Sequence, residues 1–203
     1  NTVLGESALD ASVSGGNNVA IGKNSLTANT SGAKNVAVGR SSLEDNTTAS
    51  DNTAVGDLAL SENTGAENTA VGSNSLGVNT SGTKNVALGA FSLDANTTGS
   101  QNTGLGRSSL GENTTASNNT AVGYFSLKAN TTGATNTAVG NNSLRLNTTA
   151  SNNVAVGQQT LGDNTTGANN VAVGANALLV NTTASNNTAL GYQALLLNTT
   201  GHS

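Results

Sequence analysis

Short aliphatic side chains return at a fixed interval along the whole chain. An asparagine opens a variant of NTAVG or NVAVG twelve times, from Asn1 to Asn187, and ten of the eleven intervals are 17 residues while one is 16. Numbered from this asparagine, every unit has Val, Ile or Leu at place four, Gly at place five and Leu at place nine. A repeat this short cannot bury a core alone, so the pattern predicts a stack of twelve coils.

The pattern within one unit predicts strands rather than helices. β-Branched residues are common at places two and four, Gly and polar pairs interrupt the unit, and no helical apolar spacing extends beyond one turn. We expect two short strands per coil, at places one to four and eight to nine, with a tight turn at Gly and a return at the Asn-Thr of places twelve and thirteen. The predicted fold class is an all-β solenoid. Residues 1–203 would form one repeat segment, a slice of a longer chain.

Strand alternation divides the first strand into two faces. Places two and four point one way and place three the other. We expect places two and four to fill the coil interior with the Leu of place nine, and the small residue at place three to pack against a second copy of the chain. The predicted homo-oligomer face consists of the ten alanines at place three: Ala20, Ala37, Ala54, Ala70, Ala87, Ala121, Ala138, Ala155, Ala172 and Ala189.

Asparagine at places one and twelve is expected to form stacked side-chain ladders. Ten NTT or NTS triplets match the glycosylation sequon, but a glycan on every coil would crowd its neighbours, which favours hydrogen bonding. The fourth unit, 52–67, is one residue short, yet the pattern resumes in phase at Asn68. We therefore place the deletion in the return near Gly65, with the strands continuous through Val55 and Val71.

Charge and composition exclude several functions. The 7 Lys and Arg and the 11 Asp and Glu all lie at place six, ten, eleven or the last place of a unit, which indicates solvated turns. They form no basic cluster, so we expect no nucleic-acid partner, and no apolar run is long enough for membrane insertion. The chain lacks Cys, and His202 is its one histidine. We expect no enzyme activity, no metal and no cofactor, because no acid, base or nucleophile constellation is present.

Exposed apolar residues suggest a partner. Phe91, Phe125 and Tyr124 lie outside the predicted core, at places six and seven. Towards the C-terminal end, apolar residues occupy places that mostly carry charge, Gly or Ala in earlier units. They predict a contact patch that consists of Leu179, Val180, Tyr192, Leu196 and Leu197. The patch is either a junction with a neighbouring chain or domain, which we favour, or a receptor site.

Several units resemble a known family. NVAIG at 18–22, NVAVG at 35–39 and NTAVG at 119–123 are similar to the head repeats of YadA-like trimeric autotransporter adhesins. The resemblance implies a left-handed parallel β-roll, three chains around a common axis and a place on the bacterial outer surface. The family's unit is nearer fourteen residues, however, and the NTT return is similar to repeats in phage tail fibres and large bacterial surface fibres.

The sequence therefore predicts a structural and adhesive repeat segment of an extracellular fibrous protein, with itself and a surface receptor or host cell as partners. A bacteriophage tail-fibre shaft on a virion is the first alternative. An ice-binding solenoid is the second, because the Thr at place thirteen would form an evenly spaced hydroxyl array if that return were flat. Asn and Thr bonding the local backbone of a turn is the ordinary explanation for this array.

Overall fold

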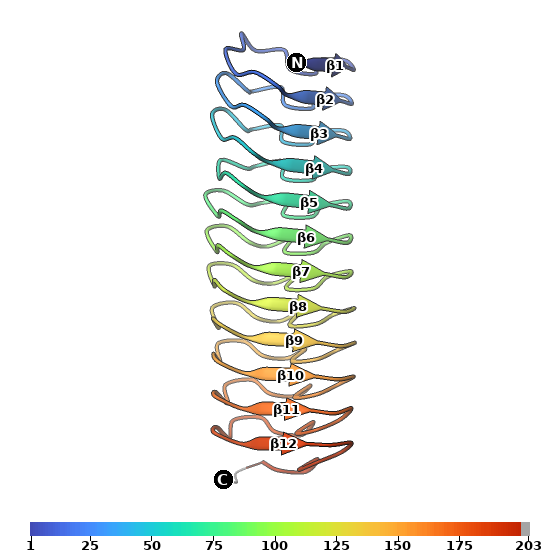
Figure 1. Cartoon of the computed structure of the whole chain (residues 1–203), viewed down its shortest axis with the longest axis vertical. Coiled ribbons are helices and arrows are strands. Elements are labelled where there is room, and N and C mark those ends of the chain that lie inside the picture. Colours follow the sequence, from blue (N-terminus) through green and yellow to red (C-terminus); the bar gives the residue numbers. More distant parts are fainter. Residues whose placement is uncertain (200–203) are drawn as a thin grey trace.

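The computed structural model describes residues 1–199, which form one straight column of stacked coils (Figure 1). Each coil contributes one strand of three residues to a twelve-stranded parallel sheet, in which each strand pairs with those of the neighbouring coils. The strands are β1 (Thr2–Leu4), β2 (Val19–Ile21), β3 (Val36–Val38), β4 (Thr53–Val55), β5 (Thr69–Val71), β6 (Val86–Leu88), β7 (Thr103–Leu105), β8 (Thr120–Val122), β9 (Thr137–Val139), β10 (Val154–Val156), β11 (Val171–Val173) and β12 (Thr188–Leu190). The described residues contain no helix, so the predicted all-β solenoid is confirmed.

The second strand predicted in each coil is wrong. In the coil that begins at Asn119, Phe125 and Leu127 have φ angles of 54° and 52°, in the left-handed region, so the segment turns instead of extending. Its backbone still bonds to the next coil, because the Leu127 N–H donates to the Ser143 carbonyl at 2.9 Å. Stacked coils thus satisfy the backbone hydrogen-bonding groups of this segment without a strand conformation. Strand propensity therefore does not predict its conformation.

The glycine at place five starts the turn after each strand, as predicted. Gly123 has a φ of 132°, which residues with a side chain rarely adopt. A Cβ atom there would also lie 2.5 Å from the carbonyl oxygen of Gly140 in the next coil. Backbone conformation and close stacking therefore both require glycine.

The coil interior is filled from places three, eight and nine. Ala121 and Leu127 are fully buried, and their counterparts join them in one apolar cluster along the rod. Thr120 and Val122, on either side of Ala121, are partly exposed. The predicted orientation of the strand is therefore inverted. The alanines expected at an oligomer face instead lie inside the chain's own coil: Ala20, Ala37, Ala54, Ala70, Ala87, Ala121, Ala138, Ala155, Ala172 and Ala189.

The physical reason for this inversion is the narrow interior of the coil. Gly104 replaces alanine at place three of the seventh coil, and a Cβ atom added there would lie 2.6 Å from Ser92 Oγ and 3.0 Å from Ser109 Oγ. The interior thus has little room beyond the alanine methyl groups that ten other coils place there. Strand alternation groups places two and four together, but it does not say which face points inward. The larger aliphatic side chains suggested the wrong face.

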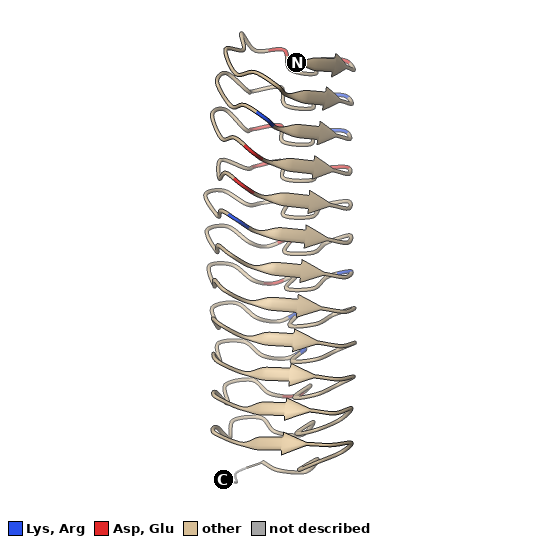
Figure 2. Cartoon of the chain, in the orientation of Figure 1, with Lys and Arg blue, Asp and Glu red and all other residues tan. Residues whose placement is uncertain are grey.

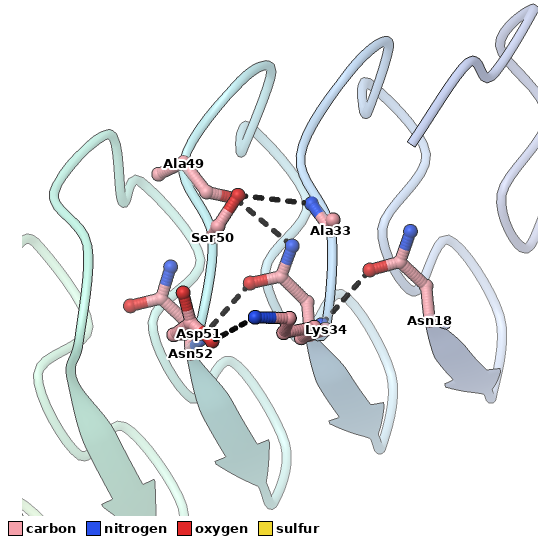
Figure 3. Close-up of polar contacts among 8 residues, drawn as sticks. Asn18, Ala33, Lys34, Ala49, Ser50, Asp51 and Asn52 are labelled. Carbon is pink, nitrogen blue, oxygen red and sulfur yellow. Dashed lines mark hydrogen bonds and ion pairs between the residues drawn. The ribbon is translucent and has the colours of Figure 1, made fainter. Parts of the chain in front are cut away.

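Two ladders of buried asparagine follow the rod, which confirms that prediction. At place one, the Asn35 N–H donates to Asn18 Oδ1 at 2.9 Å, and Asn35 Nδ2 donates to the Ala49 carbonyl at 2.9 Å (Figure 3). At place twelve, Asn130 Nδ2 donates to Asn113 Oδ1 at 2.9 Å and to a carbonyl of its own return. The place-twelve asparagines from Asn29 to Asn181 are buried, so the sequons that they open are not accessible in this fold.

The short fourth coil remains in register. Val55 pairs with Val71 in the parallel ladder, as predicted, although the two residues are one place closer in sequence than in other coils. The missing residue lies in the return. Asn63 Nδ2 donates to the Gly65 carbonyl two residues later at 2.6 Å, whereas the equivalent bond of Asn130 spans three residues.

This tighter return interrupts the place-twelve ladder and leaves one place-one side chain without its bond to the return. The Asn46 side-chain oxygen has no hydrogen-bond donor, because Asn63 Nδ2 is turned to its own return. The Asn52 side-chain nitrogen likewise has no acceptor, whereas Asn35 reaches the following return. Both side chains are fully buried. The deletion is thus tolerated by the sheet at the expense of two unsatisfied polar groups.

Candidate binding surfaces

The outward face of the sheet is long, regular and free of charge. Its side chains come from places two and four, such as Thr137 and Val139 of β9, and no Lys, Arg, Asp or Glu lies within a strand (Figure 2). Most of these side chains are partly exposed despite their neighbours above and below, and Leu88 and Val171 are each 40% exposed. With strands about 4.8 Å apart, the sheet face extends for about 55 Å. Exposed apolar patches of several hundred Å² often mark interaction sites on other proteins.

Charged side chains line turns beside the sheet and pair between coils. Lys23 lies 3.1 Å from Glu6, and Arg40 lies 2.8 Å from Asp57. These exposed pairs contribute about 0–1 kcal/mol each. Each pair joins side chains of adjacent coils.

The threonines at place thirteen are engaged in another ladder. Thr131 Oγ1 donates to the Thr148 carbonyl at 3.1 Å, and Thr148 Oγ1 donates to the Thr165 carbonyl at 3.2 Å. Eight threonines at this place donate to the next coil in this way: Thr30, Thr64, Thr80, Thr97, Thr114, Thr131, Thr148 and Thr165. This hydrogen bonding is the structural explanation for the regular Thr that suggested an ice-binding array.

The predicted contact patch lies on the last two described coils. Its members are partly or strongly exposed: Leu179, Val180, Tyr192, Leu196 and Leu197. Leu195 adds to this surface, since it is 48% exposed while Leu127 at the same place is buried. No described coil stacks on the last one, so the patch combines turn residues with the open end of the rod. Its contact with a partner stays a prediction. His202 lies outside the described residues.

A further surface was missed as a site by the sequence analysis. It is a groove of about 390 Å³ on the turns that follow β6, β7 and β8, here called the aromatic groove. Its lining residues are Phe91, Asp94, Arg107, Ser108, Gly111, Glu112, Phe125 and Lys128. The repeat register could have found it. Phe91 and Phe125 share place seven two coils apart, and Arg107 lies at place six in the coil between them.

Three aromatic rings surround one guanidinium group in this groove. The Arg107 guanidinium carbon lies 6.0 Å from the ring centre of Phe91, 6.0 Å from that of Tyr124 and 5.8 Å from that of Phe125. The rings of Tyr124 and Phe125 are stacked, with centres 4.0 Å apart. Cation–π attraction therefore holds the guanidinium between rings from different coils.

The charges of the aromatic groove are only partly paired. Lys128 Nζ lies 2.9 Å from Glu112 Oε1 and 5.5 Å from the ring centre of Phe125. Neither Arg107 nor Asp94 takes part in an ion pair with residues 1–199. Burial raises the pKa of the Asp94 carboxyl above its ordinary value of 3.8. The groove thus presents a donor group and an acceptor group that do not neutralise each other directly.

Within residues 1–199, no three His, Cys, Asp or Glu side chains are grouped closely enough to hold a metal ion. The same part of the chain has no helix with the length and apolar character needed to cross a membrane. Comparisons with protein-family models, curated proteins and solved structures find no match to the chain.

Proposed function

We propose that the chain is a structural and adhesive repeat segment of an extracellular fibrous protein, whose sheet face packs against further copies of the chain. The observation that carries this proposal is the charge-free outward face of β1 to β12 (Figure 2). Strands of three residues extend about 10 Å, so the face covers about 55 Å by 10 Å. That area, about 550 Å², is about two thirds of the roughly 800 Å² per partner in a stable protein interface.

A second copy suits this face better than an unrelated partner does. Each copy presents the same alternation of Thr or Val at place two with an aliphatic residue at place four. Two such faces can pack without burying an unpaired charge, which would be costly. The resemblance to YadA-like heads supports an arrangement of three chains, with the sheet faces rather than the alanines towards the common axis.

Self-association is tested by placing a charge on the sheet face. Val139→Glu and Val156→Glu alter outward side chains, and Asn141→Glu is the matched control on the exposed turn after β9. We expect the wild type and the control to form oligomers and both valine variants to be monomers with unchanged circular dichroism. Mass is measured by light scattering after gel filtration. A monomeric wild type, or valine variants that assemble normally, would contradict packing through this face.

Adhesion is tested separately with beads that carry the wild-type chain. The beads are applied to bacterial and epithelial cell layers, and beads that carry serum albumin serve as the reference. We expect greater attachment of the beads that carry the chain. Equal attachment would remove the adhesive part of the proposal and leave the structural part to the mass measurement.

Ice binding is the second candidate function. The surface considered is the outward sheet face and its place-two threonines, instead of the threonines at place thirteen. Place two is Thr in seven coils, and Thr120 and Thr137 are partly exposed next to aliphatic methyl groups. Regular hydroxyl and methyl groups on a rigid, charge-free surface could order water. A gap between the melting and freezing temperatures in solutions of the wild type, abolished by Val139→Glu, would support this candidate. Identical melting and freezing temperatures would exclude it.

A further inference from the structure

The repeat register creates a slot between two phenylalanine rings. Adjacent coils are about 4.8 Å apart, so the backbones of Phe91 and Phe125 are separated by about 10 Å. Ser108 occupies the same place in the coil between them, and Gly111 lies beside it. Ser108 and Gly111 leave space between the two rings, and the Arg107 guanidinium of the same coil lines that space. Its volume of about 390 Å³ is within the range of small-molecule sites.

We propose that the aromatic groove binds a neutral pyranose ring, such as a hexose unit of a surface glycan, stacked on Phe91 and Phe125. One face of a pyranose carries C–H groups, whose slight positive charge suits the negative face of an aromatic ring. Its edge carries hydroxyl groups that both donate and accept hydrogen bonds. The ligand is thus matched to the rings through its face and to the polar rim through its edge.

The polar rim supports a ligand of this mixed character. Arg107 can only donate hydrogen bonds, an ionised Asp94 can only accept them, and neither is part of an ion pair. A sugar hydroxyl can satisfy either group. With Glu112 and Lys128 already paired, two positive and two negative side chains line the groove and their charges cancel.

The same features disfavour an ionic ligand. A cation stacked on either ring would be repelled by the Arg107 guanidinium, which lies about 6 Å from the ring centres of both Phe91 and Phe125. An anion attracted to Arg107 would also meet the carboxyl groups of Asp94 and Glu112 at the rim. A neutral polyol with an apolar face avoids both conflicts.

The proposal is tested with methyl β-glucoside, methyl β-galactoside and methyl α-mannoside as probes. Saturation-transfer NMR detects binding, and titration gives the dissociation constant. We expect at least one glycoside to bind with a dissociation constant of about 1 mM, with the strongest transfer to its ring C–H protons. The double variant Phe91→Ala and Phe125→Ala should bind about tenfold more weakly or not at all, because each stacked ring is lost. Tyr192→Ala, which removes a ring outside the groove, is the control and should bind like the wild type.

Gly111→Leu provides a second variant that does not remove a ring. Leu179 occupies the same place of another coil, so the fold accommodates this side chain, which would fill the slot. We expect Gly111→Leu to abolish glycoside binding while circular dichroism is unchanged. Absence of binding by all three glycosides, or binding that survives in both the double variant and Gly111→Leu, would overturn the proposal. Equal binding of sodium sulfate or tetramethylammonium chloride at the groove would overturn it in favour of an ion site.

Discussion

Restoring the missing residue of the fourth coil is expected to stabilise the rod. Insertion of one Thr between Thr64 and Gly65 converts the return into NTTGA, the sequence found in the return after Asn164. Asn63 could then donate to Asn46 Oδ1 as well as to a carbonyl three residues later, as Asn130 does. Asn52 Nδ2 could reach the carbonyl that Asn35 finds in its next coil.

The magnitude follows from the two unsatisfied groups. A buried donor or acceptor without a partner costs about 1–3 kcal/mol, so the two together cost about 2–6 kcal/mol. Ordering one additional residue opposes the gain by about 1.5 kcal/mol. The net increase in the free energy of unfolding is therefore about 0.5–4.5 kcal/mol. Denaturation in guanidinium chloride measures it, and amide hydrogen exchange should show the added protection concentrated in the third to fifth coils.

The control is the same insertion in a coil of full length. A Thr inserted between Thr131 and Thr132 makes a coil of 18 residues, which has no rung to restore and should shift its own ladder out of register. We expect this variant to be less stable than the wild type. An inserted fourth coil that is no more stable than the wild type, with hydrogen exchange unchanged around Asn52, would refute the assignment of the two groups as unsatisfied rungs.

Three further substitutions test the interior and the groove. Leu127→Ala should lower the free energy of unfolding by about 2–5 kcal/mol, because it removes a fully buried side chain, whereas Leu196→Ala should lower it much less. Equal losses for the two variants in denaturant melts would contradict the burial of place nine. Ala121→Val should lower the free energy of unfolding by about 1–3 kcal/mol through overpacking, while Val122→Ala on the outward face should have a smaller effect. A larger loss for Val122→Ala than for Ala121→Val in the same assay would contradict the burial of the alanines. Because burial raises the pKa of Asp94, its contribution to stability is present below its ordinary pKa of 3.8 and is lost as the pH rises through the higher value in the folded chain. The melting temperature of Asp94→Asn minus that of the wild type should therefore be larger at neutral pH than below pH 3.8. A difference that does not change with pH would argue against the raised pKa of Asp94.

The sequence predicts the features that the period determines. The first of the two predicted strands, the turn at Gly, the buried Leu127 and the two asparagine ladders follow from which residues recur at which place. The short coil is also predictable, since Asn68 resumes the pattern in phase. Stacking makes each coil a copy of its neighbour, so one unit describes nearly the whole rod.

The sequence does not predict features that depend on the three-dimensional shape of a coil, or on residues that differ between coils. Thr120 and Val122 share a face, but only the narrow interior seen at Gly104 shows that this face is outside. The left-handed φ of Leu127 contradicts its usual preference, and the inter-coil hydrogen bonds compensate for it. The aromatic groove depends on three coils that differ from the others, which an averaged repeat conceals.

The perpendicular arrangement of strands and rod has a mechanical consequence. Because the hydrogen bonds between coils run along the column, tension applied to its ends pulls on one junction after another and does not shear many bonds at once (Figure 1). Each coil that peels away releases 17 residues, or about 55–60 Å of extended chain. A fibre with this construction lengthens in small equal steps under load and dissipates work at each one. The short return of the fourth coil leaves two buried side-chain groups without partners, so such a column would part first there.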